Sequence, residues 1–279
     1  MHSVSKHLKI QNFITRRTIF SILVVGIFLI PIYYVAIYGF MTTAEIFRQP
    51  PYLLPPNPTL RFYLIAFNTL SRYFLNSIIV SVGSVVLTVS IAAPAAFALA
   101  QLRVKRAKFV QFLMAFVQML PVVTTLIPLF LMYNSVGMVN TRFSVILTLS
   151  ALNVPFNVII LTAYMKSIPG ALLESAYIDG ASTLRGFFLL LPIAKPGLAT
   201  GAMFAFLLSW GDFAVSVSMV SRRSLFPMSV GLFDFIGQYG AEWNVLMAGS
   251  MLYTIPSLIV VLYAGRYLIS GLTAGAIKS

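Results

Sequence analysis

The sequence predicts an all-α, polytopic membrane protein, and its composition, its apolar stretches and the placement of its charges each predict this fold class. Of the 279 residues 59% are hydrophobic and only 9% are charged, and the mean hydropathy is +0.93. A soluble domain carries about 25% charged residues. Because so few charges cannot cover a water-exposed surface, most of the chain is expected to have lipid as its solvent.

Six apolar stretches lie between charged residues, and each has the length of roughly 20 residues that a membrane-spanning helix needs. The predicted spans are residues 19–41, 73–101, 110–133, 143–165, 197–221 and 244–266. We expect them to form a single transmembrane domain, residues 1–279. Prolines inside these stretches, such as Pro121 in the third, predict bent spans.

The basic residues predict the orientation of the spans. With the amino terminus inside, thirteen of the nineteen Lys and Arg residues fall on the cytoplasmic side and six on the outer side. Cytoplasmic loops of membrane proteins carry such an excess of positive charge. Both termini are therefore expected in the cytoplasm. The net charge of +13 is interpreted as a topology signal rather than as a nucleic-acid surface.

The sequence lacks the residue sets that catalysis and metal binding require. It has no cysteine, and His2 and His7 both lie in the basic amino-terminal segment, where solvated side chains are expected. It has no H-E-x-x-H or G-x-S-x-G motif and no paired intramembrane carboxylates, so a protease, hydrolase or proton pump would lack its reacting groups. We expect no catalytic site, no metal and no enzyme activity.

Two segments predicted on the outer side have a distinctive composition. Residues 42–72 contain five prolines, which favour extended backbone. Residues 226–243 combine aromatic side chains with Asp234 and Glu242. That pattern is typical either of an interfacial aromatic belt or of a docking surface for an external protein. The sequence leaves both alternatives open.

The segment between the fourth and fifth spans, residues 166–196, is far longer than a simple connection needs. Its pattern is a helix, a break and a second helix. Pro169 suits the opening of the first helix, where its missing N–H does no harm. Asp179-Gly180 is a stop signal, since glycine reaches the left-handed conformation that ends a helix.

The second helix of this segment has its own start signal and an apolar stripe. Ser182 or Thr183 can cap its amino terminus. Apolar residues at helical spacing form the stripe: Leu184, Phe187, Phe188 and Leu191. Such a short helix has too little apolar area to be stable alone, so the pattern favours docking on another protein.

Three motifs resemble bacterial ABC-importer permeases. Glu174-Ser175-Ala176-x-x-Asp179-Gly180-Ala181, followed by Leu191-Pro192, resembles their EAA loop. The tail Gly271-Leu-Thr-Ala-Gly275-Ala-Ile-Lys278-Ser resembles the carboxyl terminus of maltose-importer-like permeases of the carbohydrate-uptake class. Ser209-Trp210-Gly211-Asp212-Phe213 resembles the Trp-Asn-Asp/Glu segment of that class, with Gly211 in place of Asn. Ser175 replaces the usual Ala, and the spacing to Leu191-Pro192 is one residue shorter than usual.

The resemblance implies a role for the loop as a coupling helix seated in a cytoplasmic ATPase. The implied coupling residues are Leu172, Leu173, Glu174, Ser175, Ala176, Asp179, Gly180 and Ala181. The tail would add a contact with the ATPase through Gly275 and Lys278. The chain has no G-x-x-x-x-G-K-[ST] motif, so ATP is expected on the ATPase subunits and no cofactor on this chain.

The resemblance also implies the location, the partners and the cargo. The location would be the cytoplasmic membrane of a bacterium or archaeon. A second, related permease subunit would complete the translocation path, and a heterodimer is favoured. A cytoplasmic ATPase dimer would supply the energy, and an extracytoplasmic solute-binding protein would deliver a sugar or oligosaccharide. The sequence does not name that solute.

Polar residues inside the predicted spans are candidates for the translocation path. The candidates are Trp210, Asp212, Asn153 and Asn157. Asp212 is the only acidic residue inside a span, and it is predicted either to contact sugar hydroxyls or to be a structural hydrogen-bond partner. The asparagines either line the path or join helices. The rival function is an ion-coupled secondary transporter or a channel. It would need several charged residues inside the spans to couple or select ions, and Asp212 alone is weak evidence for such a site.

Overall fold

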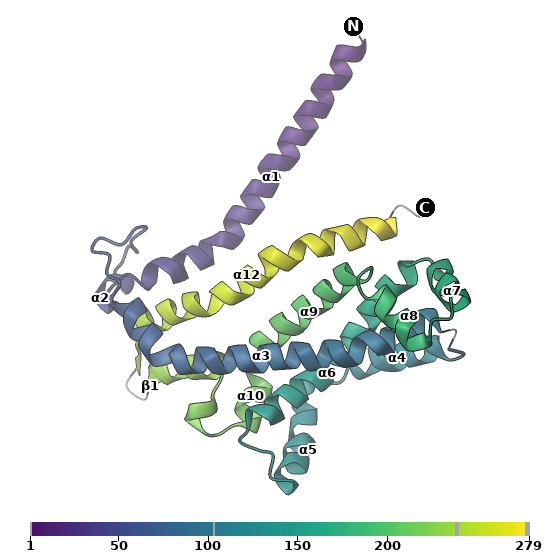
Figure 1. Cartoon of the computed structure of the whole chain (residues 1–279). Coiled ribbons are helices and arrows are strands. Elements are labelled where there is room, and N and C mark those ends of the chain that lie inside the picture. Colours follow the sequence, from purple (N-terminus) through teal and green to yellow (C-terminus); the bar gives the residue numbers. More distant parts are fainter. Residues whose placement is uncertain (1, 103, 238–239, 277–279) are drawn as a thin grey trace. The chain divides into compact units, whose positions relative to one another are not determined.

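The computed structural model describes residues 2–102, 104–237 and 240–276, with side chains described except at 2–17, 237, 240–241 and 268–276. The described residues are mostly helical, which confirms the predicted fold class (Figure 1). The chain forms two compact units. Unit 1 comprises residues 1–69 and 235–252, and unit 2 comprises residues 70–234 and 253–279.

Unit 1 contains the first long helix and the ends of two others. Its elements are α1 (His2–Tyr38), α2 (Thr43–Ile46), the first turns of α3 (Arg61–Gln101), the antiparallel strands β1 (Ile236–Gly237) and β2 (Gly240–Ala241), and the start of α12 (Trp243–Ala276). The end of α1 packs on the start of α3, where the Tyr63 ring lies 4.6 Å from the Phe40 ring. The Tyr63 hydroxyl donates to the carbonyl of Ala36 at 2.9 Å.

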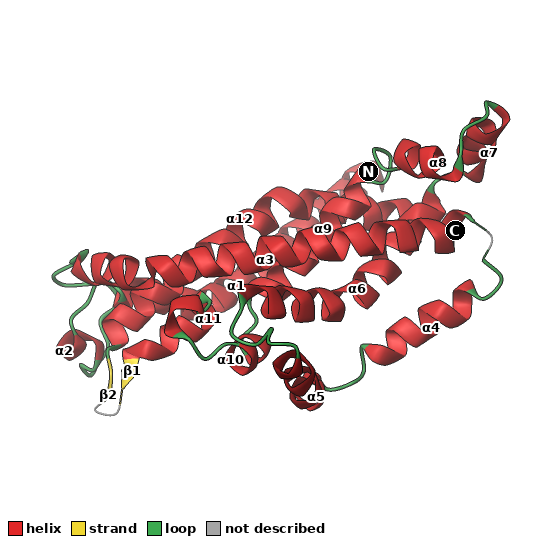
Figure 2. Cartoon of the chain, turned by 60° about the horizontal axis from the view of Figure 1, so that its bottom comes forward, coloured by secondary structure: helices red, strands yellow, loops and turns green. Residues whose placement is uncertain are grey.

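Unit 2 contains the remaining helices, and α6 is its central element. Its elements are the rest of α3 and α12, with α4 (Ala107–Val117), α5 (Val122–Ser135), α6 (Arg142–Ser167), α7 (Gly170–Ile178), α8 (Thr183–Leu190), α9 (Lys195–Trp210), α10 (Ala214–Met219), η1 (Arg223–Leu225), α11 (Met228–Gly231) and η2 (Leu232–Phe235, which ends at the boundary with unit 1). Helix α6 packs against α4, α9 and α10. Figure 2 shows α4 and α5 as separate helices joined by a turn.

The described residues include four helices that are long and apolar enough to cross a membrane. They are Thr18–Tyr38 of α1, the whole of α3 and α6, and Trp243–Tyr267 of α12. Two further pairs satisfy the same test jointly but are bent, α4 with α5 by 92° and α8 with α9 by 79°. The chain has up to six spans if each bent pair is one span, so the count of six stays a prediction.

Two predicted spans are interrupted in the structure. In the third, α4 ends at Val117 and α5 begins at Val122, with Pro121 at the N-cap position of α5. Proline has no N–H to continue a helix and its ring crowds the preceding turn, which accounts for the break. In the fifth, α9 ends at Trp210 and the short α10 follows Phe213.

One apolar core of unit 2 joins the end of α3 to α6, α7 and α8. Its buried residues include Phe97, Leu161, Met165, Leu173 and Leu190. Figure 1 shows α7 and α8 beside each other at this end of the helices. The core therefore holds the segment between α6 and α9 in a defined position.

Candidate functional site

Helix α7 begins as the sequence predicts. Pro169 occupies its N-cap position with extended backbone, and the helix runs from Gly170. The N–H of Leu172 donates to the carbonyl of Pro169 at 3.2 Å. Proline thus opens the helix without leaving an unused donor in it.

The turn between α7 and α8 is a Schellman motif centred on Gly180. Gly180 has a φ of +80°, which is the left-handed conformation. The N–H of Gly180 donates to the carbonyl of Tyr177, and that of Ala181 donates to Ala176, at 3.0 and 2.9 Å. Ser182 then caps α8 by accepting from the N–H of Arg185 at 3.4 Å. The predicted stop and cap are confirmed, with Ser182 rather than Thr183 as the cap.

The predicted coupling residues divide between an inner and an outer face of the α7–α8 hairpin (residues 170–190). Leu173 and Ala176 are buried, and Leu173 packs into the apolar core. Gly186 makes this close approach possible, because a Cβ at that position would lie 2.5 Å from Cδ1 of Leu173. The exposed members of the set are Leu172, Glu174, Ser175, Asp179 and Gly180, and Ala181 is half-buried.

The outer face of the hairpin is apolar. Ile178, immediately before the turn, is 86% exposed, Leu184 is 65% exposed and Phe188 is 59% exposed. Further large apolar residues are exposed on the hairpin: Leu172, Tyr177 and Leu189. An exposed apolar group of this size marks an interaction surface. Ile178 is not among the residues predicted from the sequence, although its position next to the turn is a signal that could identify it.

The sequence predicts that the apolar stripe of the second helix is one continuous docking face, and this prediction is wrong. Phe187 points toward the core, where its ring lies 5.4 Å from that of Phe97, and Leu191 also packs against the core. Leu184 and Phe188 remain exposed. The core thus covers one edge of the stripe, which holds the short helix in place, and leaves the other edge exposed.

The two candidate asparagines lie in a buried polar seam that joins α3, α6 and α9. The seam consists of Ser84, Ser150, Asn153, Asn157 and Ser209, each at most 4% exposed. Asn153 Nδ2 donates to Ser209 Oγ at 3.0 Å, and Ser209 Oγ donates to Ser84 Oγ at 2.9 Å. Asn157 Nδ2 donates to the carbonyl of Asn153 at 3.1 Å. The Asn157 bond lies within α6, whereas the other two bonds join helices, which is a common means of association in membranes.

Close approach of α6 and α9 accompanies the seam. A Cβ at Gly197 would lie 2.6 Å from the ring of Tyr164, and one at Gly201 would lie 2.5 Å from Oδ1 of Asn157. Glycines four residues apart let helix backbones approach in this way. Ser84 and Ser209 were missed by the sequence argument, although Ser77, Ser81, Ser84 and Thr88 follow one face of α3 at helical spacing.

Trp210 is enclosed by aromatic side chains. Its ring stacks between those of Phe206 and Tyr253, at centroid distances of 5.4 and 5.2 Å, and meets the edge of Phe74 at 5.7 Å. Its Nε1 donates to the carbonyl of Tyr253 at 3.0 Å, and the Tyr253 hydroxyl donates to the carbonyl of Trp210. These reciprocal bonds connect the end of α9 to α12 within unit 2, and they leave the ring 3% exposed.

Asp212 caps the amino terminus of α10. Its Oδ2 accepts from the N–H and the hydroxyl of Ser216, each at 2.9 Å, and its Oδ1 accepts from the N–H of Val215 at 3.2 Å. Its own carbonyl accepts from the Ser229 hydroxyl at 2.6 Å. This geometry matches the structural alternative considered for Asp212.

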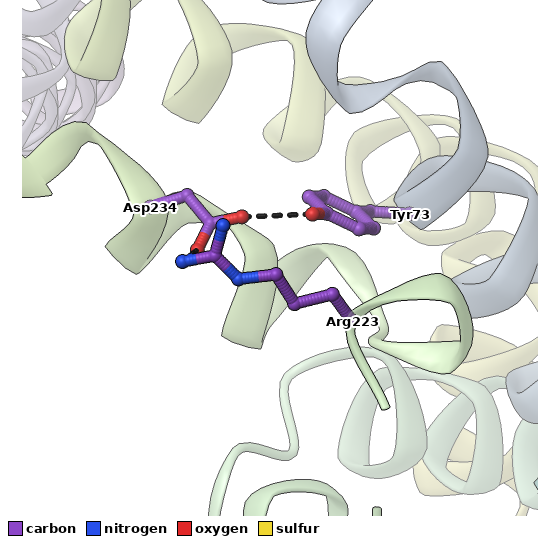
Figure 3. A network of polar contacts seen from close by, with 3 residues as sticks. All are labelled: Tyr73, Arg223 and Asp234. Atoms are coloured by element: carbon purple, nitrogen blue, oxygen red, sulfur yellow. Dashed lines mark hydrogen bonds and ion pairs between the residues drawn. The ribbon is translucent and has the colours of Figure 1, made fainter. Parts of the chain in front are cut away.

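A second polar network secures the segment that follows α10 (Figure 3). The Tyr73 hydroxyl donates to Oδ2 of Asp234 at 2.7 Å, and Arg223 Nη2 lies 3.4 Å from Oδ1 of the same carboxylate. Asn76 Nδ2 donates to the carbonyls of Ser224 and Phe226 at 3.0 Å. These contacts hold the segment against α3.

The predicted tail contact falls at the edge of the described chain. Gly275 lies in the last turn of α12, which ends at Ala276. Lys278 lies outside the described residues. The role of both in an ATPase contact stays a prediction.

Comparison with known proteins assigns the family. Residues 88–273 match the model of the binding-protein-dependent transport system inner membrane component. The sulfoquinovosyl glycerol transport system permease protein of Agrobacterium fabrum is 31% identical over 260 residues, which cover 92% of this chain and 90% of the relative. A galactooligosaccharides transport system permease protein of Bacillus subtilis is 33% identical, covering 81% and 82%. A diacetylchitobiose uptake system permease protein of Streptomyces coelicolor is 31% identical, covering 89% and 91%.

A solved structure shares the fold. The match is to a chain of a bacterial ABC transporter involved in the import of the acidic polysaccharide alginate, with a TM-score of 0.77 and 23% identity, covering 91% of this chain and 96% of the other. The family match and the identity with curated permeases, rather than this fold likeness, carry the assignment. The chain belongs to the inner-membrane components of binding-protein-dependent transport systems, the permeases of ABC importers.

Proposed function

We propose that this permease forms half of a translocation path for a sugar or oligosaccharide and that its α7–α8 hairpin couples the path to ATP hydrolysis. Three curated relatives with at least 31% identity are named for sulfoquinovosyl glycerol, diacetylchitobiose and galactooligosaccharides, which supports a carbohydrate cargo. Membership of the family makes the chain a transport component rather than an enzyme, and it does not favour an ion-coupled transporter.

The observation that carries the coupling proposal is the apolar outer face of the hairpin. Leu173 and Leu190 fix the hairpin to the core of unit 2, while Ile178, Leu184 and Phe188 remain exposed. A rigidly supported apolar surface on a segment between two spans is suited to a cleft in a second protein. Glu174 and Asp179, also exposed, would add polar contacts at its rim.

Permeases of this family work with a partner permease, an ATPase and a solute-binding protein in the inner membrane. We infer further that the partner is a related but different chain, that the ATPase is a cytoplasmic dimer, and that both termini face the cytoplasm. The excess of positive charge on the segments assigned to the inner side supports this orientation. Gly275 and Lys278 would then lie on the same side as the ATPase.

For the four candidate path residues we infer a supporting role in the conformation described. Asn153 joins α6 to α9, and Asn157 bonds back to the carbonyl of Asn153 within α6. Trp210 links α9 to α12, and Asp212 caps α10. Each of the four makes a hydrogen bond inside the protein, although Asn157 Oδ1 is buried without a hydrogen-bond partner. We infer that they shape the wall of the path. Contact with solute would require these bonds to open.

The proposal is tested by purifying the tagged chain from its native membrane in mild detergent and identifying the proteins that co-purify. We expect a second permease and a cytoplasmic ATPase. Ile178→Asp should lose the ATPase and ATP-dependent uptake but keep the second permease, because a carboxylate would enter the apolar interface. Val136→Asp is the matched control, since Val136 is 63% exposed at the end of α5 and lies away from the hairpin.

Two outcomes would contradict the proposal. Recovery of the chain alone, in a state that still moves solute down an ion gradient, would establish the rival transporter class. Retention of the ATPase and of full uptake by Ile178→Asp would show that the outer face of the hairpin is not the coupling surface.

A further inference from the structure

The segment between α1 and α3 folds back against α1. Its two ends are held together, because the N–H of Thr59 donates to the carbonyl of Phe40 at 3.1 Å. Between them, Thr42 and Glu45 form a capping box at the amino terminus of α2. We call residues 47–60, which follow α2, the fold-back segment.

A hydrogen bond to α1 sets the level that the fold-back segment reaches. The hydroxyl of Tyr33 donates to the carbonyl of Leu53. Tyr33 lies inside the candidate span Thr18–Tyr38, five residues before its end. At a rise of 1.5 Å per residue this is about 7.5 Å along the helix from that end. Leu53 is therefore held beside the span, and its carbonyl has the partner that a backbone group needs at such a depth.

The fold-back segment is apolar on its exposed side. Leu53 is 68% exposed and Leu54 is 70% exposed, and Phe47 and Leu60 are also exposed. Residues 47–60 contain a single charge, Arg48, whose guanidinium lies 4.3 Å from the centre of the Tyr52 ring. The Glu45 carboxylate of α2 accepts from Asn57 Nδ2 of the segment at 3.5 Å. Exposed neighbouring leucines such as Leu53 and Leu54 are unfavourable in water.

The aromatic residues around the segment are those that favour the boundary of a membrane. The ring of Phe47 meets the edge of Trp243 at 6.4 Å, where α12 begins. Trp and Tyr are enriched at membrane–water interfaces, and Arg extends its charge toward head groups from such positions. The segment that carries Leu53 and Leu54 is thus flanked by side chains with both apolar and polar parts, namely Arg48, Tyr52 and Trp243.

We propose that the fold-back segment is a wedge inserted into the lipid leaflet beside α1, with the side chains of Leu53 and Leu54 among the acyl chains. Its apolar surface continues that of α1, whose residues Ile30 and Ile32 are exposed in the same turns as Tyr33. This continuity, the level of Leu53 and the single charge within residues 47–60 favour lipid over a docked external protein. The wedge fixes unit 1 in the interface independently of the cargo and of the coupling hairpin.

The chain is free of cysteine, so single labels can be introduced directly. Leu53→Cys and Leu54→Cys would carry a nitroxide in the full chain, reconstituted in vesicles of phosphatidylethanolamine and phosphatidylglycerol. Phe28→Cys on α1 reports lipid, and Ala44→Cys on α2 reports water. Collision rates with O2 and with a water-soluble nickel chelate are measured by paramagnetic resonance. We expect an O2-to-nickel ratio at positions 53 and 54 close to that at 28 and several-fold above that at 44.

Ratios at 53 and 54 equal to that at 44 would place the segment in water and overturn the proposal. The proposal would also be overturned if the ratio at 53 and 54 rose only after the purified solute-binding protein was added. That result would identify a protein-docking surface. Tyr33→Phe tests the hydrogen bond to Leu53, because loss of the hydroxyl should lower the ratio at 54. An unchanged ratio in that variant would show that Tyr33 does not set the depth.

Discussion

The α7–α8 hairpin and the polar seam of α3, α6 and α9 differ in side-chain exposure. The hairpin exposes apolar side chains, whereas the seam buries polar ones. On the hairpin, predicted to lie outside the membrane, Ile178 is 86% exposed, whereas in the seam Ser84 is 0% exposed and its hydroxyl is bonded across helices. The seam has its partners inside the chain, and the hairpin has an apolar surface suited to a partner outside it. Stability should therefore depend on the seam and the inner face of the hairpin, and coupling on the outer face alone.

The largest expected effect separates the two faces of the hairpin. Leu190 is 1% exposed in the core and its neighbour Leu189 is half exposed. Leu190→Ala should lower the free energy of unfolding by about 2–5 kcal/mol, because it removes buried methyl groups and leaves a cavity. Leu189→Ala should change it by less than about 0.5 kcal/mol, as exposed substitutions do. Denaturant unfolding in detergent measures both, and equal losses would contradict the assignment of faces.

The next effect tests whether the seam depends on close backbone approach. Gly201→Ala should destabilise the chain by about 1–3 kcal/mol, because its Cβ has to displace Asn157 in a packed interior. In the structure that Cβ would lie 2.5 Å from Asn157 Oδ1. Gly265→Ala is the control within α12, where an added Cβ meets nothing within 4 Å. A fall in thermal midpoint for Gly265→Ala as large as that for Gly201→Ala would mean that helix approach is not the cause.

A smaller effect distinguishes strain from coupling. Gly180 and Gly137 have φ values of +80° and +70°, and an added Cβ at either would meet no atom within 4 Å. Gly180→Ala and Gly137→Ala should each cost about 1–2 kcal/mol of backbone strain. Only Gly180→Ala should also lower the ratio of solute transported to ATP hydrolysed, because it re-aims Ile178. Equal coupling ratios in the two variants would remove the turn from the mechanism.

The sequence predicts features that depend on local chemistry. Pro169, Gly180 and Ser182 act where they stand, through a missing donor, a permitted φ and a short hydroxyl side chain. The break at Pro121 has the same origin. Each of these signals is complete within a few residues, so no tertiary information is needed to interpret them.

Features that depend on tertiary packing could not be predicted. Leu173 points inward and Ile178 outward because the core around Phe97 lies on one side of α7, and the spacing of apolar residues does not tell which side. The two alternatives for Asp212 differ only in what its carboxylate faces, which here is the amino terminus of α10. Ser84 belongs to a polar face of α3 that its spacing reveals, but the sequence does not show that its partner is Ser209, 125 residues away.

The smallest expected effect measures the seam itself. Ser84→Ala and Ser209→Ala each remove one hydroxyl from the bond of 2.9 Å between them, and Ser209→Ala also removes the acceptor of Asn153 Nδ2. Hydrogen bonds between membrane helices contribute about 0.6 kcal/mol on average, so a double-mutant cycle should give a coupling energy near that value. The single Ser209→Ala should cost more than Ser84→Ala, because it leaves the buried amide of Asn153 without an acceptor. A coupling energy of zero would mean that the two hydroxyls are neighbours without joining α3 to α9. The stability of the seam would then rest on the bond of Asn153 to Ser209 and on glycine packing.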